Sequence, residues 1–571
     1  MVFSISRAST VFLLFSSAFS FTPCPLLGPA FPPWTLDTSD KTIASALEAL
    51  TRELDMLVST NTGSHGDVSP NTTFSIALSS ADSGSAQDEP FFWQYHHIAP
   101  ALSRSAAGSR VADENSIYRI GGLTEVFTVW CLLLSGGDHL LNDPVTKYLP
   151  ELANGTSTQD DIEHVLWDDV TVGRRSSHMS GLARDYCSTN FTLQMSPAKA
   201  SFPPRHEPPK PCCGDGIKCD SSEFIQYLAN QPLVAPPSVT QSYSNMAFHL
   251  LGYIIERIAG KPFSDVLQQY VFDVLGMTQT TMFAPLDSSN GIIPIKSLFT
   301  TITDLSIAGQ AILNSTLLTK SRTNRWLRPV SHTSNPANSL GIPWVIYSGG
   351  SYPNTSMVDV YTVLSNEGVN GGLYSSYLGL VHDFGVGFAI LSADTETPAE
   401  LNAHADIIED VVLEALMVTA PEQAAQNFGR EYQASGINSS ITVAYDELPG
   451  LCINEFVSNG TDFRAILAAL LGISKPKGLS IRLYPTQLID DSGPGSRQAF
   501  RAVFQDITEL ADNGTPTCVS WMDVDKLTYG GRGLDEFVFA LNASGDAVGV
   551  QIPALQVDLW RETNDLEKRV Y

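Results

Sequence analysis

Length, composition and charge already narrow the classes of function. The chain has 571 residues, of which 43% are hydrophobic and 16% are charged, and this is ample for a large domain and a smaller second one. Its formal net charge of -27 argues against nucleic acid or an anionic membrane surface as a partner, since both repel an acidic protein.

The first 20 residues have the pattern of a secretory signal peptide. One basic residue, Arg7, is followed by the apolar run Val11–Phe15 and by the small-x-small cleavage pattern Ala18-Phe19-Ser20. The apolar run is too short to cross a bilayer, and no later stretch is long and apolar enough to do so. The sequence therefore predicts a secreted protein without a membrane span, whose mature chain starts near Phe21.

Asn-x-Ser/Thr sequons are spread over the whole mature chain. A single sequon is often a chance match, but nine of them on an exported chain predict a glycoprotein. They stand at Asn71, Asn154, Asn190, Asn314, Asn354, Asn438, Asn459, Asn513 and Asn542.

The eight cysteines predict disulfides, because the compartment is oxidising. We expect Cys452 to pair with Cys518, since no other cysteine lies in the C-terminal region. Cys131 falls on a predicted buried helix and is interpreted as a core residue.

Four further cysteines predict a disulfide cluster on a Pro-rich loop, with the connectivity left open. They are Cys187, Cys212, Cys213 and Cys219. A zinc site that includes His206 is the alternative, but the spacing fits no common zinc pattern, and we expect no metal and no cofactor.

The first predicted elements of the mature chain are a helix and two strands. The helix covers Thr42–Leu57, and the strands are the alternating run Phe74–Ser79 and the aromatic run Phe91–Ile98. A strand, a glycine turn and a helix follow at Ile117–Ile120, Gly121-Gly122 and Leu123–Leu134. This arrangement places the free N–H groups of the first helical residues at the floor of a cleft.

Arg119-Ile120-Gly121 and the helix behind it resemble a segment of the serine β-lactamase and penicillin-binding-protein superfamily. In the superfamily this segment has the pattern YRIGS-[IV]-[ST]-K-VFT. Within the superfamily, the closer resemblance is to secreted fungal β-lactamase-like proteins. In that family a serine attacks a carbonyl, and a lysine one helical turn later takes its proton. Aligned without gaps, Gly122 occupies the nucleophile position and Glu125 the lysine position, so both groups that make the acyl-enzyme are absent.

Two later segments also resemble the family. Ser177-His178-Met179-Ser180-Gly181-Leu182 matches a family segment that is structural, and neighbours in sequence do not point at one another, so we expect no direct role for it. Tyr243-Ser244-Asn245 lies just ahead of a helical pattern and matches the Tyr-x-Asn element. The resemblance implies that Tyr243 is a general acid or base and that Asn245 holds the substrate. The alternative is a helix N-cap with a buried tyrosine.

The third site element of the family is Lys-[ST]-Gly or His-x-Gly, on the edge strand before the stretch that corresponds to Tyr374-Ser375-Ser376. Counting back places Glu367 at the basic position, or Asn366 if one residue is inserted. Neither can supply the cation that fixes a substrate carboxylate in the family. Glu367 is therefore a substrate-binding candidate beside Asn245 and Gly122.

A strand at Phe384–Ala393 and a helix at Asp406–Met417 complete the main domain, and the composition changes near Ala420. AAQNFGREYQ is linker-like, and the short β-prone runs behind it resemble the lipocalin-like β domain of fungal members. These runs are Ile441–Tyr445, Leu479–Tyr484, Phe500–Phe504 and Phe537–Leu541.

The resemblance as a whole predicts an α/β (α+β) fold. An antiparallel sheet flanked by helices, with an all-helical subdomain, covers residues 21–419 behind a signal peptide at residues 1–20. A small antiparallel β domain covers residues 420–571.

Three functions stay open. A secreted pseudo-hydrolase would bind a small molecule or peptide in the retained cleft. An enzyme with changed chemistry would use Glu125 and Tyr243 as an acid/base pair for an isomerisation, cyclisation or elimination in fungal secondary metabolism, unless Glu125 only complements the helix dipole. A hydrolase or acyltransferase for esters or amides would need a nucleophile that the sequence does not reveal. The sequence does not determine the oligomeric state.

Overall fold

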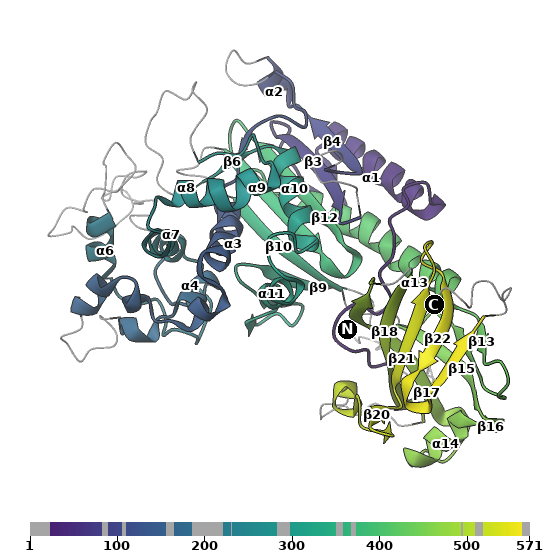
Figure 1. Ribbon diagram of the computed structural model, residues 1–571. Helices are drawn as coiled ribbons and strands as arrows, with labels where there is room; N and C mark the ends of the chain where they lie inside the picture. The colour runs from purple at the N-terminus through teal and green to yellow at the C-terminus, as the bar shows by residue number, and fades with distance from the viewer. Residues whose placement is uncertain are drawn as a thin grey trace, which may run out of the picture. The chain divides into compact units, whose positions relative to one another are not determined.

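The computed structural model describes residues 23–82, 90–104, 110–155, 165–184, 221–229, 231–282, 297–349, 358–366, 373–492, 495–508 and 518–561. The chain forms two compact units (Figure 1). The larger is Thr35–Gly350 with Met357–Thr419, and the smaller holds Ala420–Tyr571 together with the residues up to Trp34. Residues 23–34, which the sequence analysis places in the larger domain, are thus grouped with the smaller unit. None of the described helices has the length and apolar character needed to cross a membrane.

An eight-stranded sheet forms the centre of the larger unit, with the order β4-β3-β12-β11-β10-β9-β8-β7. Every pairing in it is antiparallel, as predicted. The strands are β3 Thr73–Ser80, β4 Trp93–His97, β7 Ser331–His332, β8 Asn338–Leu340, β9 Val345–Gly349, β10 Val358–Asn366, β11 Tyr374–Val381 and β12 Val386–Ala393. The strand before Tyr374 is β10. The prediction that it is an edge strand is wrong, because β10 pairs with β11 on one side and with β9 on the other.

Helices cover both faces of this sheet. Helix α10 (Ile302–Leu313) packs on β3 and β12, where its Gly309 lies close to Ser79. His404 of α12 (Asn402–Ile408) contacts Phe74 of β3, with the rings 4.7 Å apart. Residues 74 and 79 point to opposite faces of a strand, so α10 and α12 lie on opposite sides of the sheet. Helix α1 (Lys41–Thr60), capped by the Asp40 carboxylate, packs beside α12.

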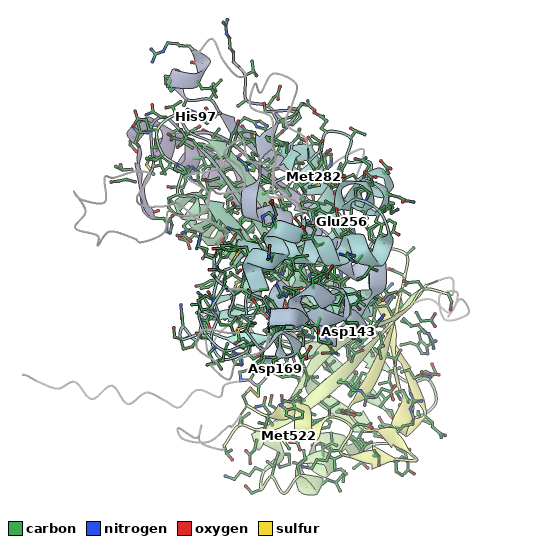
Figure 2. The ribbon with its side chains drawn as sticks, turned by 90° about the vertical axis from the view of Figure 1, so that its left-hand side faces the viewer. His97, Asp143, Asp169, Glu256, Met282 and Met522 are labelled. Atoms are coloured by element: carbon green, nitrogen blue, oxygen red, sulfur yellow. A yellow bond between two sulfur atoms is a disulfide. The ribbon has the colours of Figure 1, made fainter. Side chains whose placement is uncertain are left out.

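The predicted helical subdomain contains α3 (Thr124–Gly136), α4 (Val172–Ser176), α6 (Ser221–Ala229), α7 (Asn245–Ala259) and α8 (Phe263–Leu267). Helix α7 packs against α3 and α4. Glu256, labelled in Figure 2, accepts a hydrogen bond of 2.9 Å from the N–H of Phe263 and so ties the start of α8 to the end of α7. Gly260 ends α7 in the left-handed conformation that glycine adopts without strain.

The smaller unit is a closed antiparallel barrel, which agrees with the predicted C-terminal β domain. Its strand order is β14-β13-β23-β22-β21-β18-β17-β15, and β15 also pairs with β14. The strands are β13 Glu431–Gln433, β14 Ser440–Ala444, β15 Leu451–Ser458, β17 Leu479–Asp490, β18 Ser496–Asp506, β21 Glu536–Leu541, β22 Ala547–Ile552 and β23 Val557–Trp560. Phe500 and Phe539 are fully buried and contact each other with ring centres 5.0 Å apart, so aromatic side chains fill the interior.

The linker predicted after Ala420 is wrong. Helix α13 (Glu414–Phe428) runs through it, and β13 begins at Glu431. Ala424 and Phe428 are one helical turn apart, and both are buried in the core of the smaller unit. Their burial explains why a sequence stretch with linker-like composition is regular helix.

The expected Cys452–Cys518 disulfide is also wrong. Cys518 is bonded to Cys24, with the two Cα atoms 5.3 Å apart. Two hydrogen bonds hold the N-terminal segment there, from Cys24 N–H to Gln505 and from Ser520 to the Cys24 carbonyl. Cys452 is a buried free thiol, and its burial raises its pKa to about 11.

Cys131 is a fully buried free thiol on α3, which confirms its interpretation as a core residue. Several other predictions concern residues outside the described ones. They are the signal peptide, the cluster of Cys187, Cys212, Cys213 and Cys219 with its zinc alternative, and the candidate Glu367.

Candidate functional site

The predicted strand–turn–helix is present and positions Gly122. Strand β5 (Tyr118–Arg119) pairs with β6 (Phe299–Thr300), a 3-10 turn covers Gly121–Leu123, and α3 follows. Gly121 has a φ of 49°, in the left-handed region where a side chain would cause strain. The turn therefore favours glycine at 121, whereas Gly122 has an ordinary φ and could carry a side chain.

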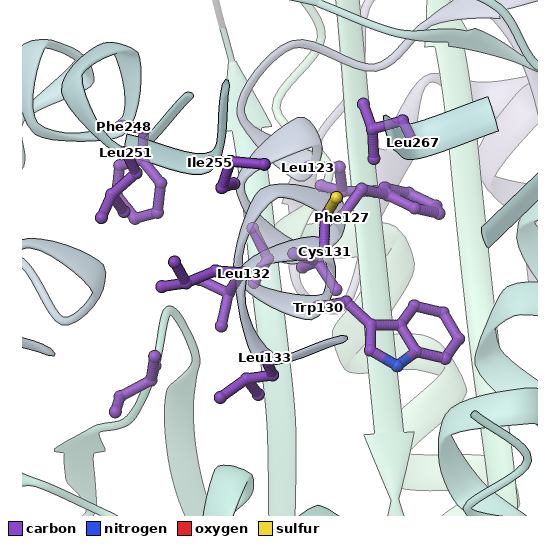
Figure 3. Packing of buried hydrophobic residues seen from close by; sticks show 14 of the residues in the cluster. Leu123, Phe127, Trp130, Cys131, Leu132, Leu133, Phe248, Leu251, Ile255 and Leu267 are labelled. Atoms are coloured by element: carbon purple, nitrogen blue, oxygen red, sulfur yellow. The ribbon is translucent and has the colours of Figure 1, made fainter. Parts of the chain in front are cut away.

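Helix α3 is buried on all sides, as Figure 3 shows for the side chains around Phe127 and Trp130. Leu251 and Ile255 of α7 belong to the same apolar cluster. A polar side chain in the first turns of this helix has no access to bulk water. Glu125, which is 5% exposed, must therefore find its partner inside the protein.

The position that a side chain of residue 122 would occupy is bordered by two hydroxyl groups. A Cβ atom on Gly122 would lie 3.1 Å from the Tyr243 hydroxyl and 3.4 Å from Ser365 Oγ. The backbone N–H of Gly122 donates a hydrogen bond of 2.7 Å to the same Ser365 Oγ. Ser365 lies on β10, two positions before Glu367, and the sequence analysis did not name it.

Tyr243 and Asn245 lie at the start of α7 and belong to this site. The Tyr243 hydroxyl donates a hydrogen bond of 2.9 Å to Asn245 Oδ1. The helix cap is Ser244, whose Oγ accepts the N–H of Ala247 and donates to the carbonyl of Ala183. The intervening serine therefore makes the cap, which corrects the alternative that Tyr243 and Asn245 serve only to begin the helix.

Glu125 contacts His178, a residue that the sequence analysis assigned to a structural segment. Its Oε2 lies 3.3 Å from His178 Nε2, and both side chains are less than 10% exposed. His178 has a φ of 56°, an unusual conformation for a residue that is not glycine. Its ring stacks on the Tyr243 ring with centres 4.8 Å apart. The histidine thus joins Glu125 to Tyr243, whereas the neighbouring Ser177 Oγ turns to the Gly173 carbonyl.

Each member of this pair keeps one unused polar atom. Glu125 Oε1 and His178 Nδ1 are buried and have no hydrogen-bond partner within the part of the chain that the structure describes. Unpaired buried polar atoms are costly, and in native proteins they often mark a catalytic or ligand-binding role. Arg184 adds a positive charge nearby, with its guanidinium 4.6 Å above the Tyr243 ring.

This arrangement suits proton transfer better than acyl transfer. Gly122 offers no nucleophile, and its N–H already donates a hydrogen bond to Ser365, so this N–H is not free to stabilise an oxyanion. Glu125, His178 and Tyr243 are three groups that can hold or move a proton, brought together by α3, the segment after α4, and α7. Of the third predicted site element, the candidate Glu367 lies outside the described residues, and Ser365, two positions earlier on β10, contacts Gly122.

Comparison with known proteins shows the family to which the chain belongs. Residues 94–413 match the family model "Beta-lactamase", which covers more than half of the chain, and residues 420–563 match "Beta-lactamase-like-like, C-terminal domain". The chain belongs to the β-lactamase family. Within this family, it has Gly122 and Glu125 where the superfamily motif has the nucleophile and its lysine, while Tyr243 and Asn245 keep the Tyr-x-Asn pattern.

The similarity to curated family members extends over nearly the whole chain. A "Beta-lactamase-like protein" of Arthroderma benhamiae is 27% identical and covers 95% of this chain and 96% of its own length. "Probable hydrolase clz13" of Cochliobolus lunatus is 24% identical, with coverage of 83% and 84%. "Probable hydrolase M10" of a Phoma species is 25% identical, with coverage of 82% of each chain.

Solved structures of the family are more distant. A class C β-lactamase superposes with a TM-score of 0.45 at 15% identity and covers 66% of this chain and 98% of its own. A β-lactamase/D-alanine carboxypeptidase from Yersinia pestis gives a TM-score of 0.46 at 15% identity, with coverage of 65% and 99%.

Proposed function

We propose that this β-lactamase-like protein catalyses acid/base chemistry on a small molecule, in place of the serine–lysine chemistry of its superfamily. The reaction class is an isomerisation or cyclisation in fungal secondary metabolism, with Glu125, His178 and Tyr243 moving the protons. The observation that carries this proposal is the buried contact between Glu125 and His178, in which each partner retains one polar atom that finds no hydrogen-bond partner among the described residues.

The chemistry requires one group to remove a proton from a substrate carbon and a second group to return a proton elsewhere on the molecule. A carboxylate in contact with an imidazole is a suitable base, since the pair can share the proton it takes. Tyr243 is a suitable acid, because its hydroxyl borders the position above Gly122 where a substrate would bind. Asn245 orients that hydroxyl through their hydrogen bond.

We further propose that the protein is a secreted glycoprotein. The sequon asparagines Asn71, Asn314, Asn438, Asn459 and Asn542 lie in the described part of the chain, and all are partly or fully exposed. Sugar attached to the three fully exposed ones, Asn314, Asn438 and Asn459, would meet solvent. The disulfide between Cys24 and Cys518 also suits an oxidising compartment.

Glu125→Gln tests the proposed chemistry. The substitution keeps the shape of the side chain but removes the proton acceptor, so we expect activity to fall by about 10²- to 10⁴-fold. The assay incubates the protein with fungal culture extracts in D2O and searches by mass spectrometry for metabolites that take up deuterium. Glu48→Gln, on the exposed surface of α1, is the matched control. Unchanged deuterium uptake in the Glu125 variant would contradict the proposal.

A second candidate function, ester or amide hydrolysis, is favoured by Ser365. Its hydroxyl lies beside the position of the missing side chain at 122, and a Cβ placed there would be within reach of both Ser365 and Tyr243. A serine hydroxyl next to a possible base is the usual form of an activated nucleophile. Its present hydrogen bond to the Gly122 N–H, however, uses the group that would stabilise the oxyanion.

A fluorophosphonate probe separates the two functions. We expect no labelling of the native protein, and labelling of a Gly122→Ser variant, whose new hydroxyl would lie beside Tyr243. If hydrolysis is the true function, the native protein is labelled at Ser365 and the Ser365→Ala variant is not. Intact mass spectrometry with peptide mapping distinguishes these outcomes.

A further inference from the structure

The larger unit contains a pocket that the proposed function does not use. It has a volume of about 730 Å³, within the range of ligand-binding pockets. It is formed by the end of α3, the turn Asp138–Asn142, helix α4, helix α11 (Lys320–Trp326) and residues 328–331. Figure 1 labels the helices α3, α4 and α11. Gly122, Glu125 and Tyr243 do not line it, so this pocket is separate from the candidate active site.

Arginine side chains make up most of the charged lining of this pocket. Arg174, Arg322, Arg325 and Arg328 line it, and Asp138 is the only carboxylate among the described residues that line it. The whole chain has 60 acidic and 33 basic residues. A pocket with four arginines and one aspartate therefore has the opposite charge balance from the chain as a whole. The pocket is a positively charged site on an acidic protein.

Two of the arginines are already engaged. Arg322 Nε and Arg325 Nη1 both bond to Asp138, at 3.0 and 2.6 Å. Arg322 also donates to the Leu133 carbonyl at the end of α3, where a cation complements the helix dipole. These two residues have a structural role and neutralise the aspartate.

The other two arginines remain available. Within the described residues, Arg174 and Arg328 form no ion pair with an acidic side chain, and no hydrogen bond of their guanidinium groups is present. An arginine that faces a pocket without an acidic partner is suited to bind an anion, because its planar N–H groups match a carboxylate in two parallel hydrogen bonds.

Several of the other lining residues are apolar and buried. Leu133, Trp326, Ile342 and Met179 are each less than 10% exposed, whereas Arg325 and Arg328 are exposed. The pocket therefore combines an apolar interior with a charged entrance. This combination does not suit a bare inorganic ion, which would gain nothing from the apolar surface.

We propose that this arginine pocket binds an organic anion, a molecule with a carboxylate at the entrance and an apolar body inside. Arg174 and Arg328 hold the carboxylate, and Trp326 with Ile342 packs against the body. Ser177 and Met179, the neighbours of His178, also line the pocket. A bound molecule would thus contact the backbone segment that carries the histidine of the candidate active site.

The test compares three probes by isothermal titration calorimetry on the full-length protein. Naphthalene-2-carboxylate is the anion, naphthalene-2-carboxamide is its neutral isostere, and sulfate is the inorganic anion. We expect the carboxylate to bind at least about tenfold more tightly than either of the others, and its affinity to fall with added salt. Equal affinity for carboxylate and carboxamide, or for carboxylate and sulfate, would overturn the proposal.

Two variants place the binding in the pocket. Arg174→Gln/Arg328→Gln should weaken carboxylate binding about tenfold or more, while Arg52→Gln/Arg532→Gln, which removes two exposed arginines elsewhere, should leave it unchanged. Ser331→Trp fills the pocket without removing a charge and should abolish binding. Undiminished binding in both the arginine variant and the Ser331 variant would show that the ligand binds somewhere else.

Discussion

Replacing Trp130 by alanine is expected to destabilise the larger unit by about 3–5 kcal/mol, the usual cost of truncating a buried aromatic side chain. Trp130 is 1% exposed on α3, and its ring lies 5.8 Å from that of Trp326. Trp326 in turn lies 5.6 Å from Trp344. Removing the indole leaves a cavity between α3 and these rings, which the rigid neighbours cannot refill.

Urea unfolding of the native protein, Trp130→Ala and a control variant measures the change in the free energy of unfolding. Trp521→Ala is the control, because Trp521 is 67% exposed and its loss should cost less than about 0.5 kcal/mol. Since the protein has two compact units, the transition of the larger one must be followed separately, for example by calorimetry. A loss below about 1 kcal/mol in Trp130→Ala would contradict the packing described for α3.

Glu409→Gln is expected to stabilise the protein at neutral pH and not at acid pH. Burial, assisted by the nearby carboxylates of Asp406 and Asp410, raises the pKa of Glu409 to about 7 from the usual 4.5. The folded state therefore binds the proton more tightly than the unfolded state does. Below pH 4.5 Glu409 is protonated in both states, and the free energy of unfolding is highest. As the pH rises from 4.5 towards 7, the unfolded state ionises first, and the free energy of unfolding falls.

The size of the effect follows from the shift in pKa. Each pKa unit corresponds to about 1.4 kcal/mol, so the ionised Glu409 costs about 3 kcal/mol above pH 7. Glutamine has no charge to bury, and the variant should be more stable than the native protein by about that amount at pH 8. At pH 4 the two should be nearly equal.

Chemical denaturation at pH 4, 6 and 8 tests this expectation. Glu414→Gln is the matched control, because Glu414 follows on the next turns of the same helical stretch but is exposed. A stability difference between Glu409→Gln and the native protein that does not change with pH would show that the carboxyl is not the titrating group.

The sequence was most informative where the structure depends on local pattern. The glycine turn before Leu123 and the alternation around Phe74 predicted α3 and β3 closely, because periodicity and turn residues act over a few positions. The same reasoning failed at residues 424–433, where polar residues on the outer side of α13 resembled a linker. Burial of Phe428, which decides that the segment is helix, is a tertiary contact.

For the candidate site, the sequence determined which groups are present. Gly122 and Glu125 exclude the serine–lysine pair whatever the packing, and Tyr243 with Asn245 is recognisable as a short motif at a helix start. Only the tertiary structure could show that His178 contacts Glu125. It also shows that Ser365, 243 positions from Gly122, accepts a hydrogen bond from the Gly122 N–H. In the same way, it shows that Cys518 forms a disulfide with Cys24, 494 positions away. Such contacts depend on strand order and helix packing, which bring together residues whose local patterns carry no information about each other.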